Sequence, residues 1–202
     1  MAANTTARGA ATQRSLLDAA VAEWSETGEV EVAAVARRAG VSAGLPYRYF
    51  GTRAGLLIAL VEDFYGRLEH AAVMRVYDAP TWLQRERRRV ADWVSFLYGE
   101  PLAPLLLGGR VGEGEVAAEH SRWLARLTET AARNVAHAQH AGELPADRDP
   151  TMFAAATLSG VHAMSSLALR TTPRPPAEEV AEQVWLFVAG AVGVPAGKDE
   201  YR

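Results

Sequence analysis

Apolar residues recur along this chain at the three- and four-residue spacing of amphipathic α-helices, and nowhere do they alternate as in a β-strand. The pattern predicts an all-α protein with about nine helices. One short helix follows Ser42, and the others cover about residues 14–27, 32–39, 52–76, 81–99, 105–107, 115–140, 149–169 and 177–192. Helix packing alone is therefore expected to build the fold.

Breaks in this pattern divide the chain. Asp78, Ala79 and Pro80 interrupt it, because proline does not continue a helix. We expect a flexible N-terminal arm at residues 1–12, a head at 13–63 whose last helix extends to about residue 76, a larger domain at 77–194 and a flexible tail at 195–202.

The head contains two helices joined by a tight turn. The apolar face of the first helix consists of Val32, Val35, Ala36 and Ala39. Gly40 allows the turn, because glycine adopts a positive φ at little cost. Ser42 is expected to cap the second helix, which requires Pro46 to lie in its first turn. This short second helix presents Arg48, and the pair is a helix-turn-helix.

Charge is distributed unevenly along the chain. The 202 residues carry a net charge of −3, yet residues 37–53 hold four arginines and no acidic residue. A basic window on a mildly acidic protein is typical of a specific DNA-binding protein with a second domain of another function. The chain has no cysteine, which excludes disulfides, thiolate chemistry and cysteine zinc sites.

The helix-turn-helix resembles the DNA-binding domain of the TetR family of transcriptional regulators. The family pattern is Ile-Ala-x-x-Ala-Gly-Val-Ser-x-Gly-x-Leu-Tyr-x-His-Phe, and residues 35–50 read Val-Ala-Arg-Arg-Ala-Gly-Val-Ser-Ala-Gly-Leu-Pro-Tyr-Arg-Tyr-Phe without a gap. Pro46, Tyr49 and Arg53 stand where the family usually has an apolar residue, His and Lys. No Ser or Thr is present to cap the helix that begins at Val32. The resemblance covers residues 14–63 and implies a second domain that dimerises and senses a small molecule.

By this resemblance the second helix enters the major groove of operator DNA, and Arg48 is our candidate for reading a base. Arginine suits that role because it donates two hydrogen bonds to guanine. The predicted DNA-binding residues are Arg37, Ser42, Ala43, Gly44, Leu45, Tyr47, Arg48, Tyr49, Thr52 and Arg53. The two tyrosines, Thr52 and Arg53 are expected to hold phosphates, which set the register without reading sequence.

A homodimer is expected because one short recognition helix reads too few bases to be selective. Two heads related by symmetry predict a pseudo-palindromic operator. The helices at 149–169 and 177–192 are apolar on more than one face, and the resemblance implies that they form a four-helix bundle between two subunits. The predicted interface residues are Phe153, Thr157, Gly160, Val161, Met164, Val184, Phe187 and Val188.

Aromatic residues of the larger domain leave two interpretations open. They form either a plain core or the walls of a cavity for a small hydrophobic or aromatic effector. The predicted ligand-binding residues are Trp93, Phe96, His120, Trp123 and His162. The two histidines are likewise either polar anchors of such a cavity or core residues. If the cavity exists, its ligand is expected to favour a head spacing unsuited to DNA.

No catalytic or metal site is predicted. His137 and His140 are three apart on a helix, but no third ligand stands near them. No Ser/His/Asp grouping suggests nucleophilic catalysis, and residues 108–114 match no phosphate-binding motif. We expect no enzyme activity, no metal and no cofactor. The arginines at positions 85 and 87–89 are interpreted as a solvated helix face.

The predicted function is a cytoplasmic repressor that binds operator DNA as a homodimer and is released by a small hydrophobic ligand. The alternative is a helical ligand-binding or scaffold protein whose helix-turn-helix no longer binds DNA. No membrane association is expected. Residues 1–13 lack a signal peptide, and the uncharged segment 151–169 contains Thr157, Ser159 and His162, which are costly in lipid.

Overall fold

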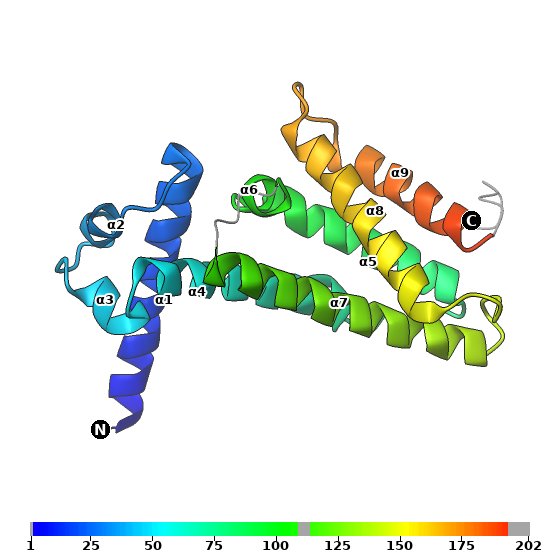
Figure 1. Cartoon of the computed structure of the whole chain (residues 1–202), viewed down its shortest axis with the longest axis horizontal. Coiled ribbons are helices and arrows are strands. Elements are labelled where there is room, and N and C mark those ends of the chain that lie inside the picture. Colours follow the sequence, from blue (N-terminus) through cyan, green and yellow to red (C-terminus); the bar gives the residue numbers. More distant parts are fainter. Residues whose placement is uncertain (1, 109–113, 194–202) are drawn as a thin grey trace.

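The computed structural model describes residues 2–108 and 114–193, and these form α-helices with one π-helical segment and no strand (Figure 1). The helices are α1 (Ala2–Thr27), α2 (Val32–Arg38), α3 (Leu45–Phe50), α4 (Arg53–Leu68), α5 (Trp82–Gly99), α6 (Ala103–Leu107), α7 (Glu115–His140), α8 (Pro150–Arg170) and α9 (Ala177–Ala191), and the π-helix η1 (Glu69–Val73) continues α4. The predicted all-α fold is confirmed.

Side-chain caps fix three of the helix starts at the predicted positions. The Thr52 hydroxyl accepts a hydrogen bond from the Gly55 amide at 3.0 Å, and Thr81 caps α5 in the same way. The Asp149 carboxylate accepts from the Met152 amide at 2.8 Å, with proline at the first position of α8. Such caps satisfy amide groups that a helix start leaves without an intrahelical partner.

Three predicted boundaries differ from the structure. Helix α1 begins at Ala2, so residues 2–12, predicted as part of a flexible arm, are helical. Their many alanines favour extension of the helix that follows. Gly44, not Ser42, is the N-cap of α3, because the Ser42 carbonyl instead accepts the Leu45 amide at 3.0 Å in a turn. The helix that continues α4 ends at Val73, short of the predicted residue 76. The predicted tail at 195–202 and most of the loop at 108–114 lie outside the described residues.

The head is formed by α1, α2, α3 and the first part of α4. Its core includes Leu16, Ala20, Val35 and Leu56, each at most 1% exposed. Helix α2 has no side-chain cap at Glu31, as the missing Ser or Thr predicted. Helix α4 then leaves the head and packs along α7, so it is shared between the head and the rest of the molecule (Figure 1).

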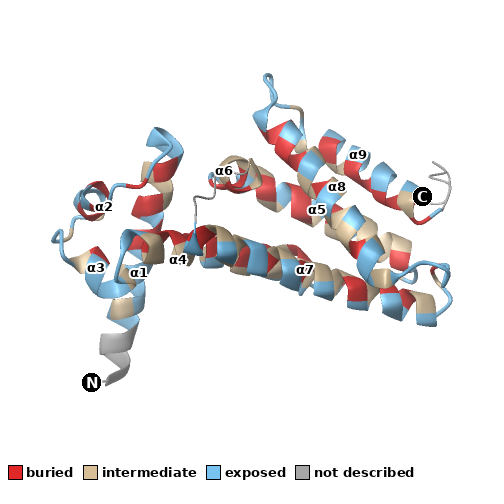
Figure 2. Ribbon diagram, viewed as in Figure 1, coloured by how far each residue is buried: buried red, intermediate tan, exposed pale blue. Residues whose placement is uncertain are grey.

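The remaining helices form a bundle in which α7 packs on α8, and α5 packs on α9. Buried positions follow the inward sides of these helices, and exposed positions follow the outer sides (Figure 2). Leu97, Val184, Trp185 and Ala189 lie in this core. The domain limits predicted from the sequence stay predictions, because one continuous apolar core joins the head to the bundle through α4.

Helix α8 is the one helix in the described part of the chain with the length and hydropathy of a membrane span. It packs against α6, α7 and α9 and buries Val161, Ser165 and Leu169 among them. Met152 and Leu167 lie on its outer side, 73% and 66% exposed. The helix therefore belongs to the bundle and carries an exposed apolar face.

Candidate functional site

The turn between α2 and α3 has the geometry that its sequence predicts. Gly40 has φ +67°, in the left-handed region that favours glycine. The Val41 amide donates to the Ala36 carbonyl at 3.0 Å, which closes the end of α2. Pro46 lies in the first turn of α3, as predicted, and is buried. It therefore anchors α3 on the head and leaves the other side of this helix to solvent.

Three consecutive residues of α3 lie on its solvent side. Tyr47 is 52% exposed, Tyr49 is 37% exposed, and Arg48 is exposed between them. Arg48 has no hydrogen bond or ion pair with any residue that the structure describes. Its guanidinium is thus available to an external acceptor.

The four arginines of residues 37–53 differ in whether they have a partner in the described chain. Arg38 pairs with Glu26 at 2.6 Å, and this pairing lowers the pKa of the Glu26 carboxyl. Arg53 donates from Nε to the Val30 carbonyl at 2.7 Å, which fixes the side chain and leaves its terminal nitrogens free of any bond within the described chain. Arg37, like Arg48, is exposed and has no such partner within residues 2–108 and 114–193.

The predicted DNA-binding residues come from the end of α2, the turn, α3 and the start of α4. Nine of them are exposed, and Leu45 is half-buried. The sequence did not identify Gly55, on which this arrangement depends. A Cβ atom at Gly55 would lie 2.0 Å from the Phe50 carbonyl oxygen, so only glycine allows α4 to start so close to the end of α3. A glycine inside the first turn of a predicted helix was the available signal.

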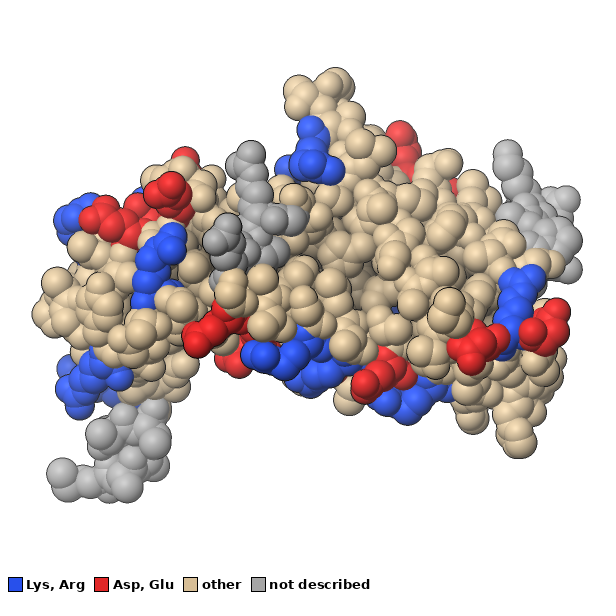
Figure 3. Space-filling view, viewed as in Figure 1, with Lys and Arg blue, Asp and Glu red and all other residues tan. Residues whose placement is uncertain are grey.

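Charges are distributed unevenly over the head. On the face drawn in Figure 3, acidic and basic atoms lie side by side at the upper edge of the head, whereas the charged atoms at its lower edge below α3 are basic. Glu23 and Glu26 on α1 pair with Arg38. The solvent side of α3 itself contains no acidic residue.

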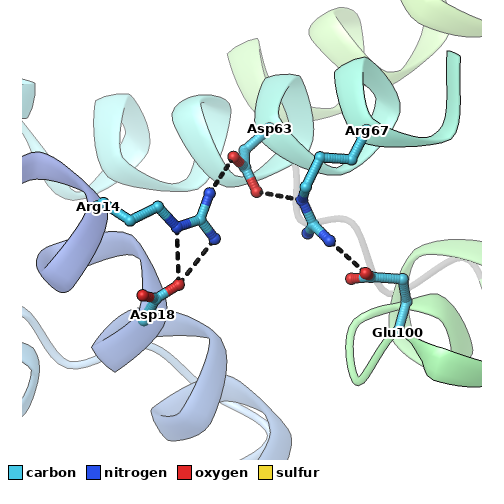
Figure 4. Close-up of polar contacts among 5 residues, drawn as sticks. All are labelled: Arg14, Asp18, Asp63, Arg67 and Glu100. Carbon is cyan, nitrogen blue, oxygen red and sulfur yellow. Dashed lines mark hydrogen bonds and ion pairs between the residues drawn. The ribbon is translucent and has the colours of Figure 1, made fainter. Parts of the chain in front are cut away.

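A chain of ion pairs links the head to the bundle (Figure 4). Arg14 on α1 pairs with Asp18 at 2.7 Å and with Asp63 on α4. Asp63 also accepts from Arg67 Nε at 2.9 Å, and Arg67 pairs with Glu100 at the end of α5. Hydrogen bonding to both carboxylates raises the pKa of Arg67 against the effect of burial. Charged contacts therefore connect α1, α4 and the end of α5.

The bundle contains an apolar cavity of about 290 Å³. Its walls come from α5, α7, α8, α9 and the end of η1, and its lining residues are Val73, Trp82, Glu86, Arg89, Val90, Trp93, Leu127, Thr130, Ala131, Asn134, Val135, Phe153, Thr157, Leu158, Val161 and Val188. Such an apolar cavity with a few polar groups is the usual form of a small-molecule site.

The charged groups of this cavity are bonded to one another. Arg89 pairs with Glu86, donates from Nε to the Ala72 carbonyl at 3.3 Å, and lies 5.0 Å from the centre of the Tyr77 ring. Asn134 Nδ2 donates to Glu86 at 3.1 Å. The prediction that these arginines form a solvated helix face is thus wrong for Arg89. This side chain packs against η1 and lies in the cavity wall.

The predicted ligand-binding residues are divided among different places. Trp93 lines the cavity, and the other four do not. His162 lines a second pocket of about 460 Å³ together with Arg170, and Leu158 lines both spaces. Phe96 packs on the Phe64 ring, with ring centres 5.6 Å apart.

His120 and Trp123 both contact Tyr65 of α4. The Tyr65 hydroxyl lies 3.1 Å from His120 Nδ1, and its ring stacks on Trp123 with centres 5.7 Å apart. Burial lowers the pKa of His120, and burial with the nearby His120 lowers the pKa of His162 to about 4. Both histidines are half-buried, His120 against Tyr65 of α4 and His162 in the wall of the second pocket, and their role stays a prediction.

The predicted interface residues also lie in different environments. Val184 is fully buried in the chain, and Val161 and Val188 are buried against the cavity, which Phe153 and Thr157 also line. Met164 packs on the core from a half-buried position.

Gly160 and Phe187 contact each other across α8 and α9. A Cβ atom at Gly160 would lie 2.4 Å from the Phe187 ring, so the close helix approach expected at this glycine occurs within one chain. Phe187 remains 37% exposed. The sequence did not identify the more exposed Met152, Leu167 and Leu186, because the outer side of an apolar helix is set by its neighbours.

Comparison with known proteins gives a match in the head. Residues 16–60 match the model of a family described as "Bacterial regulatory proteins, tetR family". The HTH-type transcriptional regulator BetI of Escherichia coli (strain K12 / DH10B) is 30% identical over 116 residues, which are 56% of this chain and 52% of BetI. The chain thus spans about half the length of the curated relatives it matches.

Solved structures match over most of the chain. FadR from Bacillus subtilis in complex with stearoyl-CoA has a TM-score of 0.74 and 18% identity, covering 88% of this chain and 98% of FadR. AibR in complex with isovaleryl coenzyme A and operator DNA has a TM-score of 0.68 and 17% identity, covering 88% and 97%. At these identities the likeness establishes the fold.

Proposed function

Because residues 16–60 match the tetR family of bacterial regulatory proteins, we propose that the chain is a DNA-binding transcriptional regulator of that family. The observation that carries this proposal is Arg48, which lies exposed on the solvent side of α3 without a partner among the described residues, on a helix with no acidic residue. The major groove of DNA admits an α-helix, and arginine there recognises guanine with two hydrogen bonds.

The neighbouring groups are suited to holding phosphates. Arg37 is exposed and unpaired in the described part of the chain. Arg53 donates from Nε to the Val30 carbonyl, and its two terminal nitrogens have no partner among the described residues. Tyr47 and Tyr49 add two exposed hydroxyl groups on either side of Arg48. Contacts of this kind position a protein on DNA and make its affinity depend on salt.

We propose that two chains bind a pseudo-palindromic operator as a homodimer through the outer sides of α8 and α9. The exposed apolar residues there are Met152, Ala156, Ala163, Leu167, Leu186 and Phe187. Those of α8 are spaced so that they share one helical face. An apolar face of this kind is usually covered by a partner in a soluble protein.

We further propose that a small molecule in the cavity releases the protein from DNA, which makes it a repressor. FadR binds stearoyl-CoA and AibR binds isovaleryl coenzyme A, so ligand binding occurs on this fold. In this chain Val73 at the end of η1 lines the cavity, and Arg89 bonds the Ala72 carbonyl. A ligand that moves these groups would move α4, which carries the head.

The chain of ion pairs in Figure 4 supports the same coupling. Asp63 on α4 forms ion pairs with Arg14 of the head and with Arg67 of its own helix. Arg67 in turn forms an ion pair with Glu100 at the end of α5. Helix α4 is thus tied to both parts of the molecule. Linkage then requires operator DNA to weaken ligand binding by the factor with which the ligand weakens DNA binding.

The alternative function is a helical ligand-binding or scaffold protein without a DNA role. An unpaired Arg48 beside an acid-free window favours the regulator, since a scaffold has no need of it. The proposal places the protein in the cytoplasm, where its DNA lies.

The test is fluorescence anisotropy with labelled duplexes from the region upstream of the gene for this chain and of its neighbours. Wild type is expected to prefer one duplex over a scrambled duplex of the same composition. Arg48→Ala should reduce that preference by about 1–3 kcal/mol, or roughly five- to 150-fold. Arg122→Ala, on the exposed side of α7, removes the same charge and should change nothing. No preference by wild type for any duplex would contradict the proposal.

A further inference from the structure

Two indole N–H groups in the cavity wall have no acceptor. Trp82 and Trp93 line the cavity and are 3% and 7% exposed. The Nε1 atom of each is buried and has no hydrogen-bond partner in residues 2–108 and 114–193. A buried donor without an acceptor is costly, and native structures contain few of them. Two of these donors belong to residues that line one cavity, where an acceptor atom of a bound molecule would satisfy them.

The charges of the cavity exclude an anionic ligand. Glu86 and Arg89 are the charged residues that line it, and they pair with each other. Arg89 also donates a hydrogen bond to the Ala72 carbonyl and lies over the Tyr77 ring. Asn134 donates a hydrogen bond to Glu86. A ligand carboxylate would therefore meet Glu86 with no free cation to balance it, and burial of an unpaired charge is strongly unfavourable.

Size and lining restrict the ligand further. The volume of about 290 Å³ lies at the lower end of small-molecule sites, which span roughly 300–1,000 Å³. Apart from the two indole groups, the paired charges and Asn134, the polar side chains of the lining are those of Thr130 and Thr157. Thr157 already donates to the Phe153 carbonyl at 2.9 Å and Thr130 accepts from Arg133 at 2.8 Å.

We propose that the cavity binds a neutral, largely apolar small molecule whose carbonyl or similar oxygen accepts hydrogen bonds from Trp82 and Trp93. This names the ligand class of the site and rests on the proposed ligand-responsive regulator. The ligand's apolar body lies against Val90, Leu127 and Val135. Its oxygen accepts hydrogen bonds from the two indole N–H groups, which have no other partner in the described residues.

Calorimetric titration of the intact protein with three probes of one shape tests the proposal. The probes are 2-acetylnaphthalene, its isostere 2-isopropenylnaphthalene without the oxygen, and 2-naphthoate with a charge. The ketone should bind about tenfold more tightly than the isostere, and naphthoate should bind most weakly. Equal binding of the two neutral probes, no binding of either, or tightest binding of naphthoate would overturn the proposal.

Matched variants assign the effect to the two indole groups. Trp82→Phe and Trp93→Phe remove the N–H groups and keep an aromatic ring, so each should lower the ratio of ketone to isostere affinity several-fold. The ratio cancels any change in cavity shape, which affects both probes. Trp123→Phe is the control, because Trp123 Nε1 is also buried without a partner but does not line the cavity. An unchanged ratio in both cavity variants, or the same loss in Trp123→Phe, contradicts the assignment. Operator binding, measured separately, distinguishes this failure from failure of the regulator proposal.

Discussion

The head and the cavity hold their unpaired polar groups in opposite environments. Arg37 and Arg48 lie in water, which satisfies a guanidinium at little cost until DNA replaces it. Trp82 and Trp93 hold their N–H groups inside the bundle, buried and without a hydrogen-bond partner in the described residues, where an unmet donor is costly. The head is therefore ready to bind without strain, whereas the cavity gains stability when a ligand fills it.

The two regions also differ in how they are assembled. Residues 37–53 form the predicted DNA surface as one continuous stretch, whereas the cavity draws its walls from five helical segments. A change confined to the head should thus leave the walls of the cavity in place, and a change in the cavity wall should leave the surface of residues 37–53 in place. The following predictions test this independence.

The largest effect is expected from Gly55→Ala, which should disable the head and spare the cavity. The added Cβ atom meets the Phe50 carbonyl at 2.0 Å, and backbone must move to relieve that overlap. We expect a loss of about 3 kcal/mol in stability of the head and loss of operator binding. Gly66→Ala in the same helix meets nothing within 4 Å, so this control should be neutral or slightly stabilising.

The readouts are thermal unfolding, operator anisotropy and calorimetry with 2-acetylnaphthalene. A Gly55→Ala protein that binds its operator like wild type would refute the role of this glycine. Loss of probe binding in the same protein would refute the independence of the two regions.

A smaller effect is expected where the bundle meets a second chain. Leu167 is 66% exposed on the outer side of α8, so Leu167→Glu should leave the fold of one chain unchanged. A carboxylate buried at the proposed interface should weaken dimerisation by about 2–3 kcal/mol. Val76→Glu is the control, because Val76 is 91% exposed outside α8 and α9. Analytical ultracentrifugation measures both, and a dimer of unchanged affinity for Leu167→Glu would place the interface elsewhere.

The stability of the bundle should fall at acidic pH because of His162. Its pKa falls from 6.5 to about 4 in the folded chain, so below pH 6.5 the unfolded chain binds a proton that the folded chain does not. The free energy of unfolding therefore decreases as the pH falls from 6.5 towards 4. Between pH 7 and pH 5 the decrease should be roughly 2 kcal/mol. Burial is the main cause of this lowered pKa, the nearby His120 adds to it, and Arg170 is the cation that lines the same pocket as His162.

Urea unfolding at the two pH values measures this loss. His162→Gln should lose less stability than wild type on going to pH 5, whereas His137→Gln, exposed on α7, should behave as wild type. Equal pH dependence in all three proteins would mean that His162 is solvated in the folded chain.

The smallest effect separates the neighbours Arg37 and Arg38. Arg37 is unpaired within the described residues, and Arg38 is held by Glu26 and Glu23. Arg37→Ala should weaken binding to all duplexes by about 1 kcal/mol and reduce the salt slope by about one, and Arg38→Ala should change both less. Anisotropy at several salt concentrations gives both quantities. The reverse order would show that the ion pair to α1 opens when DNA binds.

The sequence predicted the fold well because its signals are local. The Thr52 and Asp149 caps, the turn at Gly40 and the range of α7 from Glu115 to His140 each depend on residues a few positions apart. The prediction that Ser42 caps α3 is wrong, because residues 42–45 form a turn before the helix begins. That failure also reflects local geometry which residue preference alone does not determine.

The cavity could not be predicted in the same way, because its members are brought together by packing. Trp93 was identified as an aromatic residue of a predicted helix, but Glu86, Asn134 and Val188 become neighbours only when α5, α7 and α9 meet. Arg89 reads as a solvated cation in the sequence and lies in the wall only because η1 covers it. The role of the predicted DNA-binding residues stays a prediction.

Leu158 gives the bundle a capacity for change that the head does not have. Its side chain lines both the cavity of about 290 Å³ and the pocket of about 460 Å³ beside Arg170, so it forms part of the partition between them. A mutation to alanine would join the two volumes and bring a cation within reach of a longer molecule. One substitution could thus change which molecules the bundle accepts, while α3 and the rest of the head keep their sequence.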